Sequence, residues 1–291
     1  MTGVRERELV VGGIRTVLRE AAPEAGPASG AREAVVFVHG NPGPSSDWVG
    51  LAGGAGEFAR AVAWDQPGFG KADKPRDFPH TVPGHADFID GAVRALGLDR
   101  VHLVLHDFGG PWGLEWAAAH PERVASLVLV NTGVLLGYRW HTLARIWQTP
   151  VLGELFMAAA TRGGTTALLR RTDPGLSPAA LDAIYHAGSH PETKRAVRRL
   201  YRASKQRMVD QWSAQAAARL RGLDVPVLVL WGARDAYLPV AQAYRQREVF
   251  PQAEVVELAD SGHWPFLDNP DAVAGAVLPF LRRVVGSTAY H

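Results

Sequence analysis

Short apolar runs bounded by turn residues recur along the chain and limit its fold more than any other feature. Two of them are AVVFVHG, residues 34–40, and VHLVLHD, residues 101–107. Their apolar residues are continuous rather than alternating, which is typical of strands covered on both faces in a parallel sheet. Helix-like stretches lie between several runs, so the order predicts βαβ units. The other predicted strands are 61–68, 126–131, 226–232 and 253–260, and the predicted helices beside the 101–107 strand are 84–97 and 110–123.

The pattern departs from this alternation twice. Residues 8–20 form two alternating segments around a Gly-Gly pair, which predicts a hairpin at the edge of the sheet. Residues 133–222 show no convincing strand, and we expect a helical insertion over the sheet. The sequence thus predicts a core domain of 1–132 and 223–291 with a helical cap domain of 133–222. The expected cap helices lie within 141–162, 177–188 and 191–220.

Composition excludes several classes of protein. The 291 residues are 47% hydrophobic and 21% charged, as in an ordinary globular protein, and the net charge is only +2. Without a long basic run interleaved with aromatic residues, a nucleic-acid partner has little support. The chain has no cysteine, which excludes disulfides, thiolate catalysis and zinc-thiolate sites. We expect a soluble cytoplasmic protein, monomer or homodimer, that needs no metal, cofactor or membrane.

Polar residues follow several of the predicted strands. They are His39 to Pro42, Asp107, Asp235 and His263. In open α/β sheets ligands bind beyond the carboxyl ends of the strands, so these side chains should converge on one site. Asp107 is also a good helix N-cap, which would be a purely structural role. An acid, an acid and a histidine in that chain order favour a catalytic role instead.

In these residues the sequence resembles the α/β-hydrolase family over nearly the whole chain. The family has a nucleophile elbow of strand, sharp turn and helix, followed by an acid and a histidine. The matching positions are Asp107, Asp235 and His263, while HGNP at 39–42 matches the oxyanion-hole loop and DQPGFGKADKP at 65–75 another landmark. The resemblance implies an α/β-hydrolase fold, with a mostly parallel central sheet flanked by helices and a helical cap insertion.

An aspartate at the elbow changes the expected chemistry. A carboxylate is already anionic at neutral pH, and it suits displacement of a leaving group at a saturated carbon, which gives an alkyl ester on the enzyme. His263, oriented by Asp235, would then activate water to hydrolyse that ester. The resemblance places the backbone N–H groups of Asn41 and Phe108 around the oxyanion. The expected substrate is a small apolar electrophile, with water as the second reactant.

Aspartate at the elbow is typical of epoxide hydrolases and of haloalkane and haloacetate dehalogenases. His106 before the nucleophile resembles epoxide hydrolases and haloacetate dehalogenases, and LYRA at 200–203 resembles the cap segment that carries their functional tyrosine. We therefore expect Tyr201 to donate a hydrogen bond to an epoxide oxygen, with Trp147 or Trp140 as a possible second donor. We also expect His39 to contact the substrate. Epoxide hydrolysis is the preferred prediction.

Two alternatives stay open. Asn41 resembles haloalkane dehalogenases, in which that side chain helps to hold the halide, but those enzymes pair it with a Trp where this chain has Phe108. A phenylalanine ring has no N–H for a halide. The other alternative is a non-catalytic protein that binds a small molecule on the same fold.

Overall fold

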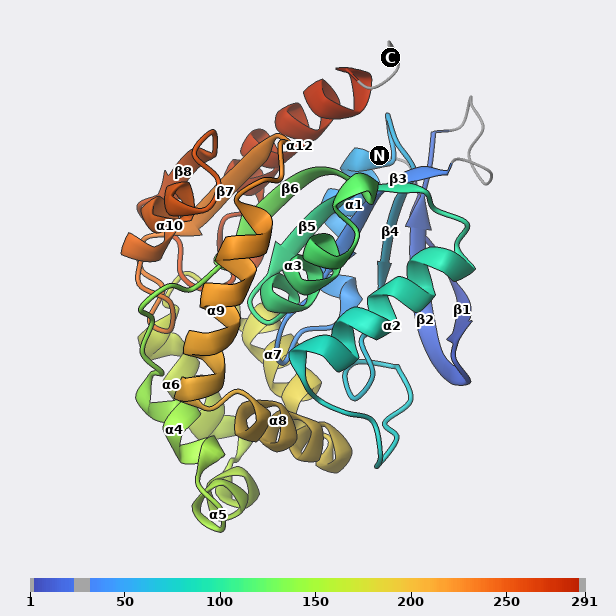
Figure 1. The fold of residues 1–291 in the computed structure, drawn as a ribbon. Helices are drawn as coiled ribbons and strands as arrows, with labels where there is room; N and C mark the ends of the chain where they lie inside the picture. Colours follow the sequence, from blue (N-terminus) through green and yellow to red (C-terminus); the bar gives the residue numbers. More distant parts are fainter. Residues whose placement is uncertain (1–2, 24–31, 288–291) are drawn as a thin grey trace.

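An eight-stranded sheet forms the centre of the computed structural model, which describes residues 3–23 and 32–287 (Figure 1). The strand order is β1-β2-β4-β3-β5-β6-β7-β8, with β1 antiparallel to β2, β2 antiparallel to β4, and parallel pairing from β4 to β8. This mostly parallel sheet confirms the predicted fold class. The strands are β1 (Arg5–Val11), β2 (Ile14–Ala21), β3 (Glu33–Val38), β4 (Ala61–Trp64), β5 (Arg100–His106), β6 (Val124–Val130), β7 (Val227–Gly232) and β8 (Glu254–Leu258).

Helices cover both faces of the sheet because alternate strand residues point to opposite sides. In β3, Val36 and Val38 join one apolar cluster with α2, α3, α9 and α10, whereas Val35 and Phe37 join a second cluster with α1 and α12. Within the described residues, no helix has the length and apolar character needed to span a membrane. These helices are α1 (Val49–Ala55), α2 (Val82–Ala95), α3 (Gly109–Ala119), α9 (Gln206–Leu220), α10 (Ala241–Arg245) and α12 (Pro270–Ser287), with the short α11 (Pro265–Asp268) before α12.

The predicted strands and the edge hairpin are all present. Each of the six apolar runs contains a strand, and β1 pairs with β2 through residues 5–11 and 14–20. The last strand departs from the expected burial, since β8 is only partly covered. It lies at the edge of the sheet and is covered less completely than the central strands. The predicted core domain also contains residues 1–2, 24–31 and 288–291, which lie outside the described residues.

Between β6 and β7 the chain is helical, as expected, but the helices are shorter than the sequence suggested. The segment 141–162 divides at Val151, whose φ of 67° no helix accommodates, and 191–220 divides at Ser204. A further helix, α6, was not expected. The limits 133 and 222 of the cap domain stay a prediction. The helices of this insertion before α9 are α4 (Thr142–Gln148), α5 (Leu152–Ala159), α6 (Arg162–Thr172), α7 (Pro178–Ser189) and α8 (Pro191–Ala203).

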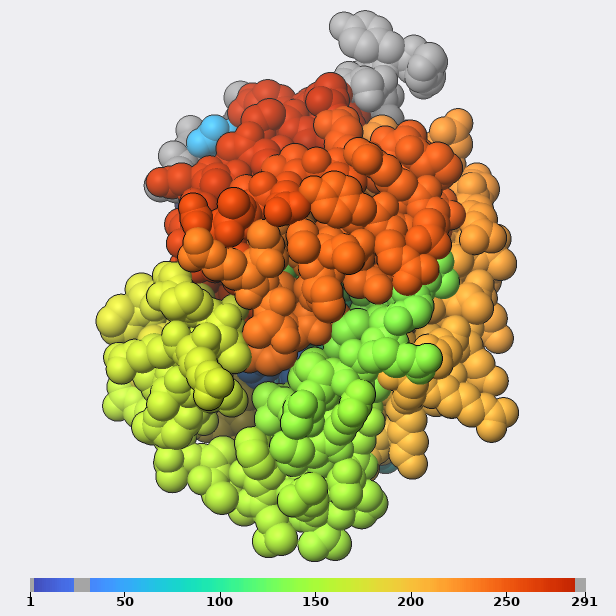
Figure 2. Space-filling model, turned by 90° about the vertical axis from the view of Figure 1, so that its left-hand side faces the viewer, coloured from blue at the N-terminus to red at the C-terminus, as the bar shows by residue number. Residues whose placement is uncertain are grey.

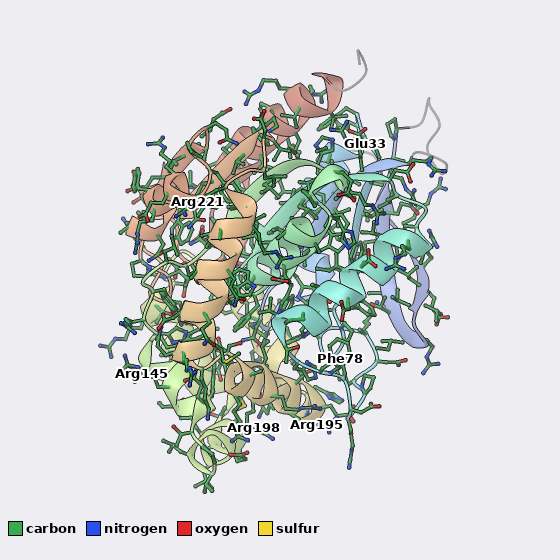
Figure 3. All side chains as sticks on the ribbon, viewed as in Figure 1. Glu33, Phe78, Arg145, Arg195, Arg198 and Arg221 are labelled. Carbon is green, nitrogen blue, oxygen red and sulfur yellow. The ribbon has the colours of Figure 1, made fainter. Side chains whose placement is uncertain are left out.

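Helix α8 fastens the insertion to the loop that follows β4. Arg195 donates a hydrogen bond to the carbonyl of Lys74 at 3.2 Å, and Arg199 donates to the carbonyl of Arg76. Figure 3 shows Arg195 on α8 next to the loop that carries Phe78. The insertion is therefore held over the carboxyl ends of the central strands, where the polar residues of the sequence analysis converge.

Candidate active site

The turn after β5 holds Asp107 in a left-handed conformation with φ at 48°. Aspartate tolerates this region better than most residues, yet the conformation still costs on the order of 1 kcal/mol. The turn is tight: a Cβ on Gly109 would lie 2.4 Å from the carbonyl oxygen of Val38, and the Thr132 hydroxyl donates to the Asp107 carbonyl at 2.6 Å. The local sequence therefore forces the Asp107 side chain out of the strand and over the end of the sheet.

Two backbone amides hold one oxygen of the Asp107 carboxylate. Its Oδ1 accepts the N–H of Asn41 at 3.0 Å and the N–H of Phe108 at 2.5 Å. The other oxygen, Oδ2, lies 3.3 Å from Nε2 of His263. The two oxygens thus have separate surroundings, one bound to amide donors and one beside the imidazole.

His263 lies between two carboxylates. Its Nδ1 is 2.7 Å from Oδ2 of Asp235, a distance that fits an N–H donated to the acid. The Asp235 side chain is fully buried and also accepts the backbone N–H groups of Tyr237 and Leu238 and the side-chain N–H of Asn131. These contacts fix the acid, and the acid fixes the tautomer and orientation of the ring.

The pKa values of His263 and Asp107 depend on each other and on the charge of Asp235. Burial works to lower the pKa of His263, but the charges and hydrogen bonds of Asp235 and Asp107 outweigh it and raise that pKa well above its usual value. Burial works to raise the pKa of Asp107, whereas its hydrogen bond and ion pair with His263 bring the pKa below the usual 3.8. Both shifts favour the charged pair, an imidazolium between two carboxylates.

Three further contacts hold the loop that carries His263. His106 donates from Nε2 to the His263 carbonyl at 2.8 Å, and burial lowers the pKa of His106 to about 4, which keeps its ring neutral. The His263 N–H donates to Oδ1 of Asp173 at 2.7 Å, and Asp268 accepts the N–H of Gly262 at 2.6 Å. Since Asp173 belongs to the cap insertion, the insertion helps to position the loop of the core that carries His263.

A cavity with two lobes surrounds Asp107. The larger lobe has a volume of about 420 Å³ and the smaller about 170 Å³. Four side chains border both lobes: Asp107, His141, Tyr201 and Tyr237. Figure 2 shows the surface hollowed where the green and yellow cap segments meet the orange segment, and these segments also supply lining residues of the smaller lobe. Asp107 therefore lies where the lobes join.

Several hydrogen-bond donors line the cavity. Burial, with the charge of Asp107 adding to it, raises the pKa of Tyr201 well above 10, so its hydroxyl stays protonated. The indole N–H of Trp147, in the smaller lobe, is buried without a hydrogen-bond partner among the described residues. Nδ1 of His141 accepts the Ala144 N–H at 3.2 Å, which leaves the ring proton on Nε2, and burial lowers the pKa of His141 to about 4.

The structure brings together most of the residues predicted from the sequence. Those at the site are Asp107, Asp235, His263, Asn41, Phe108, Tyr201 and Trp147. His39 is the exception: its Nε2 accepts the N–H of Gln66, its Nδ1 donates to the Gly40 carbonyl, and it borders neither lobe. It holds the Asn41 loop rather than the substrate. Within the part of the chain that the structure describes, no group of three His, Asp or Glu side chains could hold a metal ion.

Sequence reasoning missed four residues at the site: Asn131, His141, Asp173 and Tyr237. Asn131 ends the apolar run at 126–131, so its place after a strand was the one available signal. The other three lie in loops or at a helix end, where no motif marks them.

Comparisons with known proteins bear on this geometry. A family model described as alpha/beta hydrolase fold matches residues 33–270. The chain belongs to the α/β-hydrolase fold family. This α/β-hydrolase is 29% identical to the cis-3-alkyl-4-alkyloxetan-2-one decarboxylase of Xanthomonas campestris pv. campestris, over 89% of this chain and 91% of that protein.

Two solved structures share the fold. Haloalkane dehalogenase DbeA from Bradyrhizobium elkani USDA94 matches with a TM-score of 0.82 and 22% identity, over 98% of this chain and 99% of the other. Epoxide hydrolase CorEH matches with a TM-score of 0.78 and 18% identity, over 97% and 99%. At these identities the two structures support the fold alone. The family makes the chain a hydrolase of the α/β fold, and the site bears on which bond it breaks.

Proposed function

We propose that this α/β-hydrolase converts an epoxide to a vicinal diol through a covalent ester on Asp107. The observation that carries the proposal is the placement of that carboxylate. It borders both lobes of the cavity, one of its oxygens accepts two amide N–H groups, and the other lies beside His263. A carboxylate held as an anion in an apolar cavity is a nucleophile for saturated carbon, and serine chemistry is not available at this elbow.

In the first step, Oδ2 of Asp107 forms a bond to one ring carbon, and the bond between that carbon and the ring oxygen breaks. Negative charge develops on the ring oxygen, which takes a proton from the Tyr201 hydroxyl. The raised pKa of Tyr201 keeps this proton in place until the ring opens. His263 then loses its proton, which restores the Tyr201 hydroxyl, and the site holds a neutral imidazole beside a neutral ester.

In the second step, His263 takes a proton from water as the water oxygen bonds to Cγ of Asp107. The charge moves to Oδ1, which already accepts the N–H groups of Asn41 and Phe108. Collapse breaks the bond between Cγ and the alkyl oxygen, and that oxygen takes the second proton of the attacking water, from the new hydroxyl on Cγ, to become the second hydroxyl of the diol. Asp107 returns as the carboxylate and His263 as the imidazolium.

The test is the intact mass of a His263→Gln variant after incubation with small epoxides, followed by peptide mapping. The variant lacks the base, so the ester forms and persists. We expect an adduct with the mass of one whole epoxide, located on the peptide that contains Asp107. The same incubation of a His263→Gln, Asp107→Asn double variant is the control and should give no adduct.

Other outcomes of that experiment decide against the epoxide. A folded variant that gains no mass from any epoxide contradicts the proposal. A ligand that binds tightly and stays chemically unchanged would indicate a binding protein instead.

The relative from Xanthomonas supports a second candidate, because its substrate is also a strained ring with an oxygen on saturated carbon. Asp107 could open a dialkyl oxetan-2-one by the same attack, with a carboxylate as the leaving group. A separate incubation of His263→Gln with a dialkyl oxetan-2-one distinguishes the two candidates. If the oxetan-2-one labels Asp107 at a lower concentration than the epoxides do, it is the better substrate; if the epoxides do so, the epoxide proposal stands.

Carbon–halogen hydrolysis has one favourable observation. The unpartnered N–H of Trp147 and the side chain of Asn41 border the same small lobe next to Asp107, where a halide could be held. An adduct equal to an alkyl group without its halogen would identify this reaction.

A further inference from the structure

The two lobes meet at Asp107, the reacting group of the proposed function. Among the described residues, only Asp107, His141, Tyr201 and Tyr237 border both lobes. The ring carbon that Asp107 attacks must lie about 3 Å from Oδ2 before reaction. The ring of a substrate must therefore sit at the junction, with the space of one lobe on each side of it.

The larger lobe is suited to an apolar chain. The insertion contributes Trp140, Met208, Val209 and Trp212 to its wall, and the core contributes Val82 and Leu238. Met208 is 51% exposed, so this lobe extends from the nucleophile towards the surface. Among the described residues that line it, Asp107 is the one Asp, and none is Glu, Lys or Arg.

The smaller lobe is lined in the same way but by other elements. Leu143, Trp147 and Met157 come from α4 and α5, and Leu168 from α6 is 40% exposed. Lys194 also borders this lobe, and its ammonium group donates one hydrogen bond to the Met157 carbonyl at 2.8 Å. Among the described residues, Lys194 is the one Lys or Arg that borders either lobe, and most of the other lining side chains are uncharged.

We infer that the natural substrate is a strained ring substituted on both ring carbons, with one uncharged apolar chain for each lobe and the longer chain in the larger lobe. This inference rests on the proposed function, because it takes the ring carbon at Asp107 as the reacting atom. A ring with a single substituent would leave one apolar lobe filled with water, and it would lose the stabilisation that burying a second chain provides.

The experiment compares three epoxides that have the same ring reactivity: the cis-dimethyl, cis-methyl-butyl and cis-dibutyl oxiranes. Each step of the series adds three methylenes to one side. A fully buried methylene changes kcat/KM by about fourfold, so each step should raise kcat/KM by up to about sixtyfold in the natural sequence.

Two variants then close one lobe each. Val209→Trp on α9 fills the larger lobe and Leu143→Trp on α4 the smaller; both positions are half-buried and border one lobe only. The matched control is Val10→Trp on β1, which is 50% exposed and borders neither lobe. The rate of each variant is expressed relative to its own rate with the dimethyl oxirane.

We expect both lobe variants to keep the rise in kcat/KM from the dimethyl to the methyl-butyl oxirane. Both should lose the further rise from the methyl-butyl to the dibutyl oxirane. A single butyl chain can enter whichever lobe is open, whereas two chains need both. The inference is overturned if one lobe variant loses both gains while the other keeps both, since a single lobe would then bind the chain. It is also overturned if the natural sequence gains nothing at the second step. Hydrolysis of none of the three by folded enzyme would instead contradict the proposed epoxide function.

Discussion

At the scale of single residues, the ion pair between Asp107 and His263 links the two steps of the proposed mechanism. The Asp107 charge and hydrogen bond are among the causes that raise the pKa of His263. Once Asp107 is an ester its charge is gone, so that pKa must fall. The lower pKa favours the neutral imidazole, which is the form that can take a proton from water. Ester formation thus favours the form of His263 that hydrolyses the ester.

The same coupling predicts how ester formation depends on pH. Only the Asp107 anion reacts, so the alkylation rate falls as pH drops through the pKa of that carboxyl. In the natural sequence the pair with His263 keeps this pKa below 3.8 despite burial, and the rate should stay level from neutral pH to about pH 5. In His263→Gln the burial of Asp107 remains while its main cationic partner is lost, so the acid decline should move to higher pH.

Rapid quenching followed by intact mass measures this rate in a single turnover. His186→Gln, at an exposed position of α7, makes the same change away from the site and should behave as the natural sequence does. Identical acid declines in His263→Gln and His186→Gln would show that His263 does not set the pKa of Asp107.

At the scale of secondary-structure elements, the segment between α6 and α7 contacts the loop that carries His263. Asp173, buried at the end of α6, accepts the backbone N–H of His263, and its second oxygen has no partner among the described residues. Burial raises the pKa of Asp173. Burying this carboxylate costs free energy. We expect that the contact with His263 offsets this cost in function, by setting the position of the imidazole relative to the ester.

We predict that Asp173→Ala slows hydrolysis of the ester by about 10- to 100-fold, because a small misplacement of a catalytic group has an effect of this size. Alkylation should change far less, since Asp107 is held by other contacts. Asp173→Asn keeps an oxygen for the His263 N–H and should restore most of the hydrolysis rate. Rapid-quench measurement of both steps checks this, and equal slowing of the two steps would reduce Asp173 to a structural role.

The strands of the core could be predicted because short patterns in the local sequence determine where they form. Continuous apolar runs identified β3 to β8, and the Gly-Gly pair identified the β1–β2 hairpin. The cap helices were predicted less well: the break at Val151 depends on a strained φ of 67° that no local residue preference favours. The sequence TRGGTTALLRRT contains two glycines, so α6 has weak intrinsic helix propensity and depends on packing.

At the scale of the whole molecule, the site assembles where the sheet ends and the insertion covers it. The order of Asp107, Asp235 and His263 could be read from the chain because each follows a strand of one parallel sheet. The two lobes could not be predicted from the sequence, because much of their walls consists of side chains of α4, α5, α6 and α9, which come together only in the folded protein. Asp173 and His141 escaped prediction for the same reason.

The central claim is that oxygen reaches the product by way of Asp107. It is tested most directly by a single turnover in ¹⁸O-labelled water, with enzyme in excess over a cis-dialkyl oxirane. Water attacks Cγ of Asp107, so we predict that the diol of the first turnover carries no label and that the peptide containing Asp107 gains one ¹⁸O atom. Label in that first diol, with none on Asp107, would mean that water attacks the substrate directly and would contradict the covalent account.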